Sequence, residues 1–575
     1  MASAWASSPL DSVSLPSAVD GKASVERHAE ATLSSQEVIR QQAREDTLRQ
    51  QQEQVPDVRL DKARPASKTE RLPLDEKPCF VIQRIQIIGD TAKNFPWLLD
   101  AVNQVDDKAE GRCLGSQGVN LVMKRMQNEL IARGFITTRI LAAPQDMSHG
   151  VLQLTLMPGR IHEVRFTADS SPRATLWNAL PAKPGDILNL RDIEQALENF
   201  KRIPTAEADI QISPSTGKDA RPGDSDLLIS WKQNNPFRIN LSVDDAGSKA
   251  TGLLQGSATL SYDDWWTLND LFYISFNHDL DGKSRQTRGT EGYTAHYELP
   301  YGHWLLGWTA SHYRYAQAVA GRHQTYLYSG NGESQEIKLS RMLYRDAIHK
   351  LGGYLRGWTR ASHNYIDDTE VRVQRRRMAG WEAGLTHKFF GGEATLDSSF
   401  GWRQGTGAMS ALPAPEENGG TGTSRPVIRI ADAQLNLPFR LGSTRWHFSS
   451  TWRAQWNGTP LVPQDRFSIG SRYTVRGFDG ENVLSAERGW LLRNDLSLNL
   501  GHSGQALYAG LDYGEVDGPS AKILAGKRLA GGVVGLRGNL KNLSYDLFIG
   551  QPYTKPQYFQ TANTTAGFNL NWSLP

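Results

Sequence analysis

Two acidic residues beside two tryptophans form the most enzyme-like group in the sequence. Asp263 and Asp264 directly precede Trp265 and Trp266. Paired carboxylates beside an aromatic stacking platform are the groups that glycoside hydrolysis uses. The same four residues also fit a turn between two β-strands, with the tryptophans at a lipid interface. We favour the turn.

Other chemical candidates are weaker. The thirteen histidines are scattered without the spacing of metal ligands. The run Arg375-Arg376-Arg377 could bind phosphate, but at the end of a strand it is expected to face a lumen and lipid headgroups. The sequence contains no P-loop, no dinucleotide-binding glycine fingerprint and no His-Glu-x-x-His motif. We therefore predict that the protein is not an enzyme and has no catalytic, cofactor-binding or metal-binding residues.

The composition of the chain indicates which kind of fold carries these residues. The 575-residue chain has a net charge of +3, which does not indicate nucleic acid as a partner. Mean hydropathy is −0.49 and no apolar run is long enough for a transmembrane helix. Sixteen Trp and eighteen Tyr are concentrated after residue 260 and suit the aromatic girdles of a membrane β-barrel, whose strands alternate in polarity.

Residues 236–575 have the pattern of such a barrel. Strand-like segments of ten or more residues recur there, for example FRINLSVDDAG, NDLFYISFNHDL and LLGWTASHYRY. Short turns alternate with long polar loops, at 280–287, 404–426, 457–486 and 552–563. Seventeen segments can be counted, but antiparallel closure needs an even number, so we assign 322–332 to a loop hairpin and predict sixteen strands. A soluble propeller or sandwich would have shorter strands and tight turns at both ends.

Before the barrel, two units repeat the order β-α-α-β-β over residues 78–158 and 159–235. In the first, FVIQRIQIIG precedes the helical segments 95–105 and 119–134, and two alternating strands follow. In the second, RIHEVRFTA precedes the segments SPRATLWNAL (171–180) and NLRDIEQALENFKRI, which we predict to be helices. Each sheet would have an open edge able to accept an extended peptide.

Residues 1–55 form an N-terminal segment, and a linker with several prolines follows at 56–77. Ser34 and Glu37 have the spacing of a capping box, and good helix formers continue to about residue 55. The helix has few apolar residues, so it belongs in water, along a polar wall or in an aqueous lumen.

The only two cysteines, Cys79 and Cys113, lie in the first repeat. They could be two buried thiols, but we favour a disulfide. A loop of this size would stabilise the fold by about 3–4 kcal/mol in the chain-entropy model, and the bond would indicate an oxidising compartment such as the periplasm.

Several stretches have counterparts in a known family: PCFVIQRIQIIG, QNELIARGFITTRILAAPQD, LTLMPGRIHEVRF, LNLRDIEQALENFKRIP, VRGFDG and LYAGLDYGEV. The two repeats resemble POTRA domains. From about residue 34 to the end, the chain resembles the outer-membrane transporters of two-partner secretion, the TpsB family of haemolysin and filamentous-haemagglutinin exporters. The branch that exports contact-dependent growth-inhibition toxins is the most similar.

The resemblance implies a monomeric pore in the bacterial outer membrane, with POTRA domains in the periplasm. It would secrete a large unfolded exoprotein of the TpsA type, bound through those domains, without ATP. The helix at about 34–55 would plug the lumen, although the sequence also allows a solvated spacer. We considered a barrel-assembly factor, a diffusion porin and an extracellular carbohydrate enzyme as alternatives.

The resemblance also implies a functional loop. In the family, the loop with the motif V-R-G-F/Y folds into the lumen, and its arginine pairs with an aspartate of the motif F-x-D-x-G on an interior strand. The first motif matches Val475, Arg476, Gly477 and Phe478, and the second gives Asp512 and Gly514. A guanidinium can hold a carboxylate through two parallel hydrogen bonds, which lysine cannot reproduce. Gly510 stands where the family has an aromatic residue, so the local packing must differ.

Overall fold

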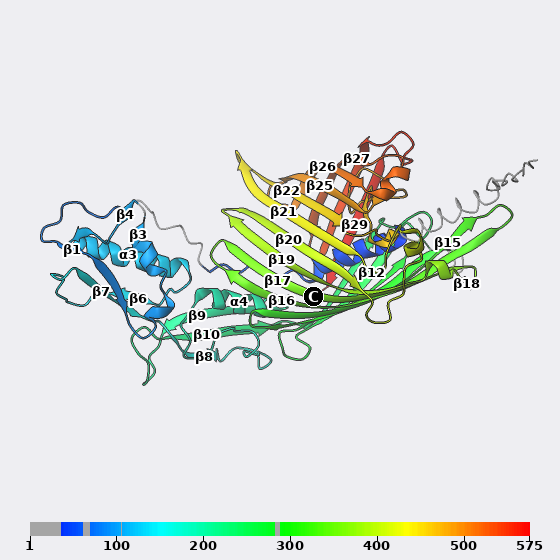
Figure 1. The fold of residues 1–575 in the computed structure, drawn as a ribbon. Helices are drawn as coiled ribbons and strands as arrows, with labels where there is room; N and C mark the ends of the chain where they lie inside the picture. Colours follow the sequence, from blue (N-terminus) through cyan, green and yellow to red (C-terminus); the bar gives the residue numbers. More distant parts are fainter. Residues whose placement is uncertain (1–35, 61–69, 105, 282–287, 575) are drawn as a thin grey trace, which may run out of the picture.

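The computed structural model of the chain describes residues 36–60, 70–104, 106–281 and 288–574. A helical segment at 36–52 lies inside a β-barrel, and two α/β domains follow one another at one end of that barrel (Figure 1). Ser34 of the expected capping box and residues 61–69 of the expected linker lie outside the described residues. None of the described helices is both long and apolar enough to cross a lipid bilayer.

The first α/β domain contains a three-stranded sheet covered by helices. Its elements are β1 (Phe80–Ile82), β2 (Arg84–Ile88), η1 (Ala92–Asn94), α2 (Leu98–Val102), β3 (Asn103–Gln104), β4 (Asp107–Lys108), β5 (Arg112–Leu114), α3 (Ser116–Ala132), β6 (Arg139–Leu141) and β7 (Val151–Met157). In the sheet, β7 pairs in parallel with β2 and antiparallel with β6. Helix α3 buries Val122, Met126 and Leu130, which recur every four residues and form one apolar stripe.

The disulfide is confirmed. Cys79 and Cys113 are bonded, with 5.3 Å between their Cα atoms, and the bond fixes the short sheet of β1 and β5. The linker also contributes to this domain, because the Glu76 carboxylate accepts hydrogen bonds from the backbone N–H groups of Gly115, Gln117 and Gly118 at the start of α3. An acidic side chain is favourable there because the first N–H groups of a helix have no partner within the helix.

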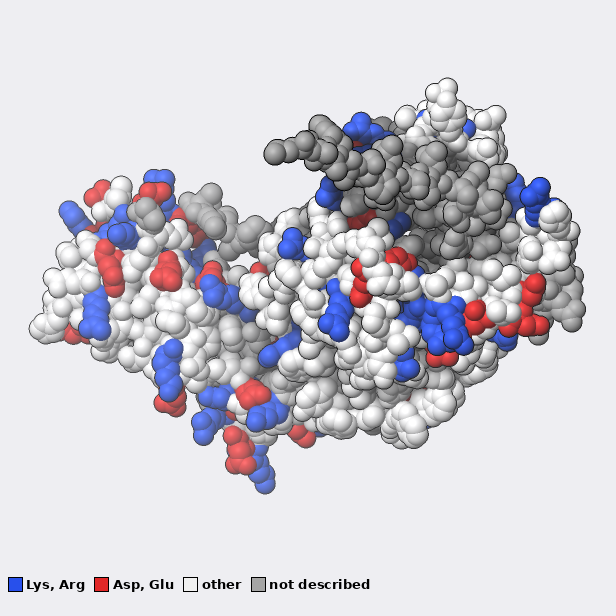
Figure 2. All heavy atoms as spheres, turned by 45° about the vertical axis from the view of Figure 1, so that its right-hand side comes forward, with Lys and Arg blue, Asp and Glu red and all other residues white. Residues whose placement is uncertain are grey.

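The second domain repeats the topology of the first. It consists of β8 (Ile161–Phe166), α4 (Leu190–Phe200), β9 (Ala206–Pro214) and β10 (Ser225–Gln233), and β10 pairs in parallel with β8 and antiparallel with β9. The expected helix at 171–180 is wrong, because these residues form turns. Their polar groups bond to the barrel instead: Asn178 bonds to the backbone at Leu268, Pro300 and Gly302. On the face shown in Figure 2, the α/β domains carry acidic and basic side chains intermixed.

The barrel is closed by sixteen antiparallel strands. They are β11 (Phe237–Asp244), β12 (Gln255–Asp263), β13 (Leu271–Asp279), β14 (Gly289–Tyr301), β15 (Trp304–Ala320), β16 (Thr325–Arg345), β17 (His349–Ile366), β19 (Arg376–Gly391), β20 (Ala394–Thr406), β21 (Val427–Leu441), β22 (Thr444–Asn457), β25 (Arg488–Asn499), β26 (Gln505–Asp517), β27 (Arg528–Leu540), β28 (Leu543–Thr554) and β29 (Thr565–Leu574). The first and last strands pair antiparallel, with Ile239 opposite Leu574, which an even number of strands allows. Two-residue β18 (Thr369–Glu370) is an appendage of β17.

The assignment of 322–332 to a separate loop hairpin is wrong in detail. Thr325 already begins β16, which stays in register with β15 from Thr325 opposite Ala320 to Arg341 opposite Trp304. The predicted number of strands is unchanged because the segment continues a wall strand. The hairpin extends far beyond the end of the barrel that faces away from the α/β domains (Figure 1).

Side chains alternate between the lumen and the outer wall, as strand geometry requires. On β26, Tyr508 and Asp512 are buried, whereas Leu507 and Leu511 on the other face are exposed. Apolar side chains point outward on many strands, for example Leu306, Ile337, Leu355, Leu385 and Ile549. Short 3₁₀ segments, η2 (Arg372–Gln374), η3 (Pro415–Gly419), η4 (Pro463–Asp465) and η5 (Pro519–Ile523), lie in the longer connections.

Candidate functional site in the barrel lumen

The loop between β22 and β25 folds into the barrel. Its short strands β23 (Phe467–Ile469) and β24 (Leu484–Ala486) pair with each other. An apolar cluster joins the loop to the wall: Ile469, Val475, Phe478, Leu484 and Ala486 of the loop and strand pair pack with Leu491, Val516 and Leu529 of the wall. The loop is therefore a packed part of the interior.

Arg476 is the polar centre of this loop. Its Nε lies 2.7 Å from Asp512 Oδ2 and its Nη2 lies 2.8 Å from Asp512 Oδ1, which is a bidentate pair. The backbone N–H of Arg476 donates to the same carboxylate at 2.9 Å. Nη2 also donates to Asp495 Oδ1 at 2.6 Å. Arg476 and Asp512 are 7% and 3% exposed, so both charges depend on each other for compensation.

Glycines in the wall make room for this arginine. A Cβ atom at Gly510 would lie 2.7 Å from Arg476 Nη2 and 2.6 Å from Asp495 Oδ1. A Cβ atom at Gly531 would lie 2.0 Å from the Arg476 carbonyl oxygen. At Gly510, where the sequence departs from the family pattern, the space above the Cα atom is filled by the guanidinium.

The other motif residues are packed around the pair. Gly477 has φ +92°, and a Cβ atom there would lie 2.4 Å from the Gln551 carbonyl oxygen. At Gly514, a Cβ atom would approach Val475 to 2.9 Å. Phe478 is buried and contacts Phe559 edge to face. All six motif residues predicted from the resemblance therefore lie in one cluster.

Sequence reasoning missed Asp495 and the glycine at 531. Asp495 is on β25, opposite Gly510 of β26, and no motif surrounds it. Glycines inside strands at 510 and 531 were the available signal, since such glycines often mark close approach of another part of the chain.

The helical segment 36–52 lies in the lumen and is held there by polar contacts. Arg49 pairs with Glu336 on β16 at 2.6 Å. Thr251 donates to Glu37, and Arg40 donates to the Gly480 carbonyl oxygen at 2.8 Å. The last contact joins the helix directly to the infolded loop.

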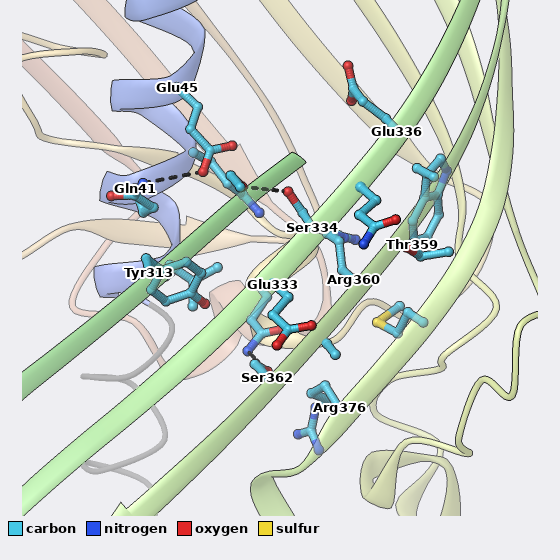
Figure 3. A pocket seen from close by; sticks show the side chains of 18 of the residues that line it. Gln41, Glu45, Tyr313, Glu333, Ser334, Glu336, Thr359, Arg360, Ser362 and Arg376 are labelled. Atoms are coloured by element: carbon cyan, nitrogen blue, oxygen red, sulfur yellow. Dashed lines mark hydrogen bonds between the residues drawn. The ribbon is translucent and has the colours of Figure 1, made fainter. Parts of the chain in front are cut away.

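Between the helix and the wall is a polar cavity of about 180 Å³. Gln41 and Glu45 of the helix point towards β15, β16 and β17, where Tyr313, Ser334 and Arg360 face them (Figure 3). A helix this polar is compatible with a wet interior, which was the reason for expecting it in a lumen.

The end of the helical segment contacts the wall near the α/β domains. Tyr273 donates to Glu53 at 3.0 Å, and Glu298 pairs with Arg202 of the second domain at 2.9 Å. Glu53, His296 and Glu298 bring possible metal-ligand atoms within 4.8 Å of one another, a cluster that the sequence spacing of the histidines did not indicate. His296 Nδ1 lies 2.9 Å from Thr309 Oγ1, so each of the three residues also has a protein partner.

The remaining candidates have structural roles. Asp263 and Asp264 lie at the turn between β12 and β13, where Asp263 pairs with Arg238, and Trp265 and Trp266 are 46% and 64% exposed. The favoured interpretation of a turn is confirmed. In the arginine run, Arg375 pairs with Glu370 and Arg376 with Glu416.

A closed barrel with an apolar outer wall, a lumen that holds a helix and an infolded loop, and tandem α/β domains at one end defines the class of outer-membrane protein transporters. The chain belongs to the haemolysin secretion/activation protein ShlB/FhaC/HecB family, whose model matches residues 223–538. A ShlB-type POTRA model matches 80–159 and a second POTRA model matches 160–214.

Similar proteins agree with this assignment. The chain is 36% identical to outer membrane transporter CdiB-2 of Burkholderia pseudomallei (strain 1026b), over 96% of this chain and 95% of that protein. It is 30% identical to outer membrane transporter CdiB of Escherichia coli, over 85% and 82% of the two chains. The structure of CdiB from Acinetobacter baumannii has a TM-score of 0.84 and 31% identity, and the match covers 94% of this chain and 98% of that one.

The protein is therefore an outer-membrane transporter of two-partner secretion, with POTRA domains on the periplasmic side. The resemblance inferred from the sequence is confirmed. The alternatives of a porin, a barrel-assembly factor and a carbohydrate enzyme do not fit this family membership.

Proposed function

We propose that this transporter secretes one large exoprotein of the contact-dependent growth-inhibition type, in an unfolded form and without ATP. Whole-chain similarity to transporters named CdiB supports this choice of partner. The periplasm offers no nucleotide, so folding of the exoprotein outside the cell supplies the driving force. The transporter acts as a monomer, with the lumen of one barrel as the path.

The observation that carries the proposal is the occupied lumen. The helical segment 36–52 and the infolded loop both lie in the path of the exoprotein, so the resting transporter is closed. The helix is held by ion pairs and hydrogen bonds, such as Arg49–Glu336, and by few apolar contacts. Polar contacts of this kind can be replaced by water or by polar groups of another chain, so the helix serves as a plug that leaves when the exoprotein engages.

The infolded loop has a different role. Its apolar cluster and the buried Arg476–Asp512 pair make it a fixed part of the lumen. Because the guanidinium holds two carboxylates, the loop keeps one position along the path. We propose that Arg476 positions the loop so that the exoprotein slides past it.

The POTRA domains receive the exoprotein first. Strands β6 and β9 are at the edges of their sheets and can accept an extended segment as an additional strand. Neither domain is proposed to carry out chemistry.

Co-expression tests the proposal. The transporter and the large exoprotein encoded beside it are produced together, and the exoprotein on intact cells is measured by its accessibility to added protease. Surface exposure should require the transporter and should be lost when residues 78–158 are deleted from an inserted barrel. Exoprotein that reaches the surface without the transporter would contradict the proposal.

A further inference from the structure

A short piece of the linker is bound in a built site at the junction of the second POTRA domain and the barrel. Residues 57–60 run between helix α4 and the periplasmic ends of β16, β17 and β19. We define the junction site by Glu194 and Glu198 of α4 and by Arg345, Lys350 and Lys388 of the barrel.

The junction site holds the linker mainly by its backbone. The N–H of Val58 donates to Glu198 Oε1 at 2.9 Å, and the N–H of Leu60 donates to Glu194 Oε1 at 2.9 Å. Arg345 Nη2 donates to the Val58 carbonyl oxygen at 2.5 Å. Every residue except proline can offer the same N–H group, so these three contacts do not depend on the sequence of the bound segment.

The spacing of the two carboxylates matches an extended chain. Glu194 and Glu198 are four residues apart on a helix, which corresponds to about 6 Å along its axis. Val58 and Leu60 are two residues apart, which in an extended chain corresponds to about 6.6 Å. The helix therefore presents acceptors at the repeat of an extended backbone, and the bound segment runs antiparallel to α4.

Two side-chain positions add selectivity. The Asp57 carboxylate lies 2.6 Å from both Lys350 Nζ and Lys388 Nζ. Val58 packs against the apolar core of the second POTRA domain. The site thus favours an acidic residue followed by an apolar one.

The charges of the site are buried. Glu194, Glu198 and Lys350 are 0%, 6% and 9% exposed, and the Arg345 side chain is 4% exposed. If the linker left, the two carboxylates would lose their backbone donors and Lys350 would lose Asp57. The carboxylates would keep Arg345 and Lys350 as cationic partners, but each would lose a backbone donor in a buried site, so the vacated site favours another extended chain.

We propose that the junction site binds an extended segment of the exoprotein, with an acidic residue followed by an apolar one, and that the transporter's own linker occupies it at rest. This inference rests on the proposed function. Asp57 follows Gln52 by five positions, which is at most about 18 Å of extended chain. Displacement of the linker is therefore coupled to the plug helix, and the exoprotein frees the plug by replacing the linker.

The test uses the hexapeptide VPDVRL, which has the sequence of residues 55–60, with a fluorescent label and the full chain in detergent. The double variant Asp57→Asn/Val58→Ala weakens the binding of the chain's own linker to the junction site. Fluorescence anisotropy should show that the peptide binds this variant about tenfold or more tightly than it binds the unaltered chain. Equal affinity, or no binding to either protein, would overturn the proposal.

Altered peptides provide matched controls that leave the protein unchanged. N-methylation of the second valine, which corresponds to Val58, removes the N–H donor to Glu198. The peptide VPNVRL lacks the carboxylate that corresponds to Asp57. Each should bind about tenfold or more weakly than the parent peptide, the loss expected for one hydrogen bond to a charged group. Undiminished binding of the N-methylated peptide would refute backbone recognition.

A second measurement avoids the variant. In the unaltered chain, excess parent peptide should increase hydrogen exchange at residues 54–60, and the N-methylated peptide should not. If saturating parent peptide leaves the hydrogen exchange of residues 54–60 unchanged, the peptide does not displace the linker and the proposal is wrong. Because neither readout requires secretion, failure here is distinguishable from failure of the proposed function.

Discussion

Substitution of Arg476 by alanine is the sharpest perturbation of the lumen. It removes both guanidinium bonds to Asp512 and the bond to Asp495, and leaves Asp512 with the backbone N–H of residue 476. The nearest remaining cation is Arg493, whose Nε lies 3.9 Å from Asp512 Oδ2. Asp512 would then be a buried carboxylate that has lost its close cation.

Removing one partner of a buried ion pair costs about 3–5 kcal/mol. The surviving backbone N–H and the nearby Arg493 place this substitution at the low end, at about 3 kcal/mol, because they keep part of the compensation. Since 1.4 kcal/mol corresponds to a factor of ten, detachment of the loop should become roughly a hundredfold more frequent.

The assay is hydrogen exchange of residues 466–486 in the inserted, heat-resistant barrel, together with secretion of the exoprotein. Arg488→Ala is a matched control, because Arg488 pairs with Asp517 nearby but the two side chains are 50% and 39% exposed. Such a surface pair contributes only about 0–1 kcal/mol, so its loss should change exchange by less than about fivefold. If Arg476→Ala changes hydrogen exchange of the loop no more than Arg488→Ala does, or leaves secretion intact, Arg476 does not position the loop.

Three further predictions concern other parts of the chain. Gly510→Ala should increase hydrogen exchange of the loop as Arg476→Ala does, because the added Cβ atom would meet the guanidinium. Gly357→Ala is the control, since a Cβ atom there has nothing within 4 Å, and it should leave the exchange of the loop unchanged. Equal effects of the two substitutions would show that the space above Gly510 does not hold the loop. Cys79→Ser/Cys113→Ser should destabilise the first POTRA domain by about 3–4 kcal/mol, measured as faster proteolysis of that domain in the full chain, and unaltered proteolysis would contradict this. Burial raises the pKa of Asp264, in the turn between β12 and β13, to about 6 from the ordinary value of 3.8. Because the folded pKa is above that of the unfolded chain, the cost of burying this carboxyl is absent below pH 3.8, grows as the pH rises to 6 and is complete above pH 6. Asp264→Asn should therefore increase exchange protection of residues 264–270 at pH 7.5 but not at about pH 3.5, below the unfolded pKa, and equal changes at both pH values would disprove the assignment.

Much of the fold could be predicted because strand patterns are local. The alternation of polar and apolar residues along segments such as NDLFYISFNHDL indicates which side chains face lipid. The number of strands must be even because the closed barrel is antiparallel throughout. The errors occurred where tertiary contacts overrode local preference. Residues 171–180 have helix formers but bond to barrel turns through Asn178, and 325–332 continues β16 because β15 extends equally far.

The site could be predicted only in part. The motifs around Arg476 and Asp512 were recognisable, because each is a contiguous stretch with a family counterpart. Asp495 has no such context, and its role arises from the register of β25 against β26 and from the infolding of a distant loop. The junction site likewise combines a linker, a POTRA helix and three barrel strands, which no local pattern connects.

In the proposed mechanism, the helical segment 36–52 closes the pore at rest. Single-channel conductance in planar bilayers, compared between the full chain and a chain that lacks residues 1–55, measures this closure. The lumen contacts of the helix predict a clear rise in conductance on deletion. An unchanged conductance would show that the helix does not close the pore and would identify it as a spacer.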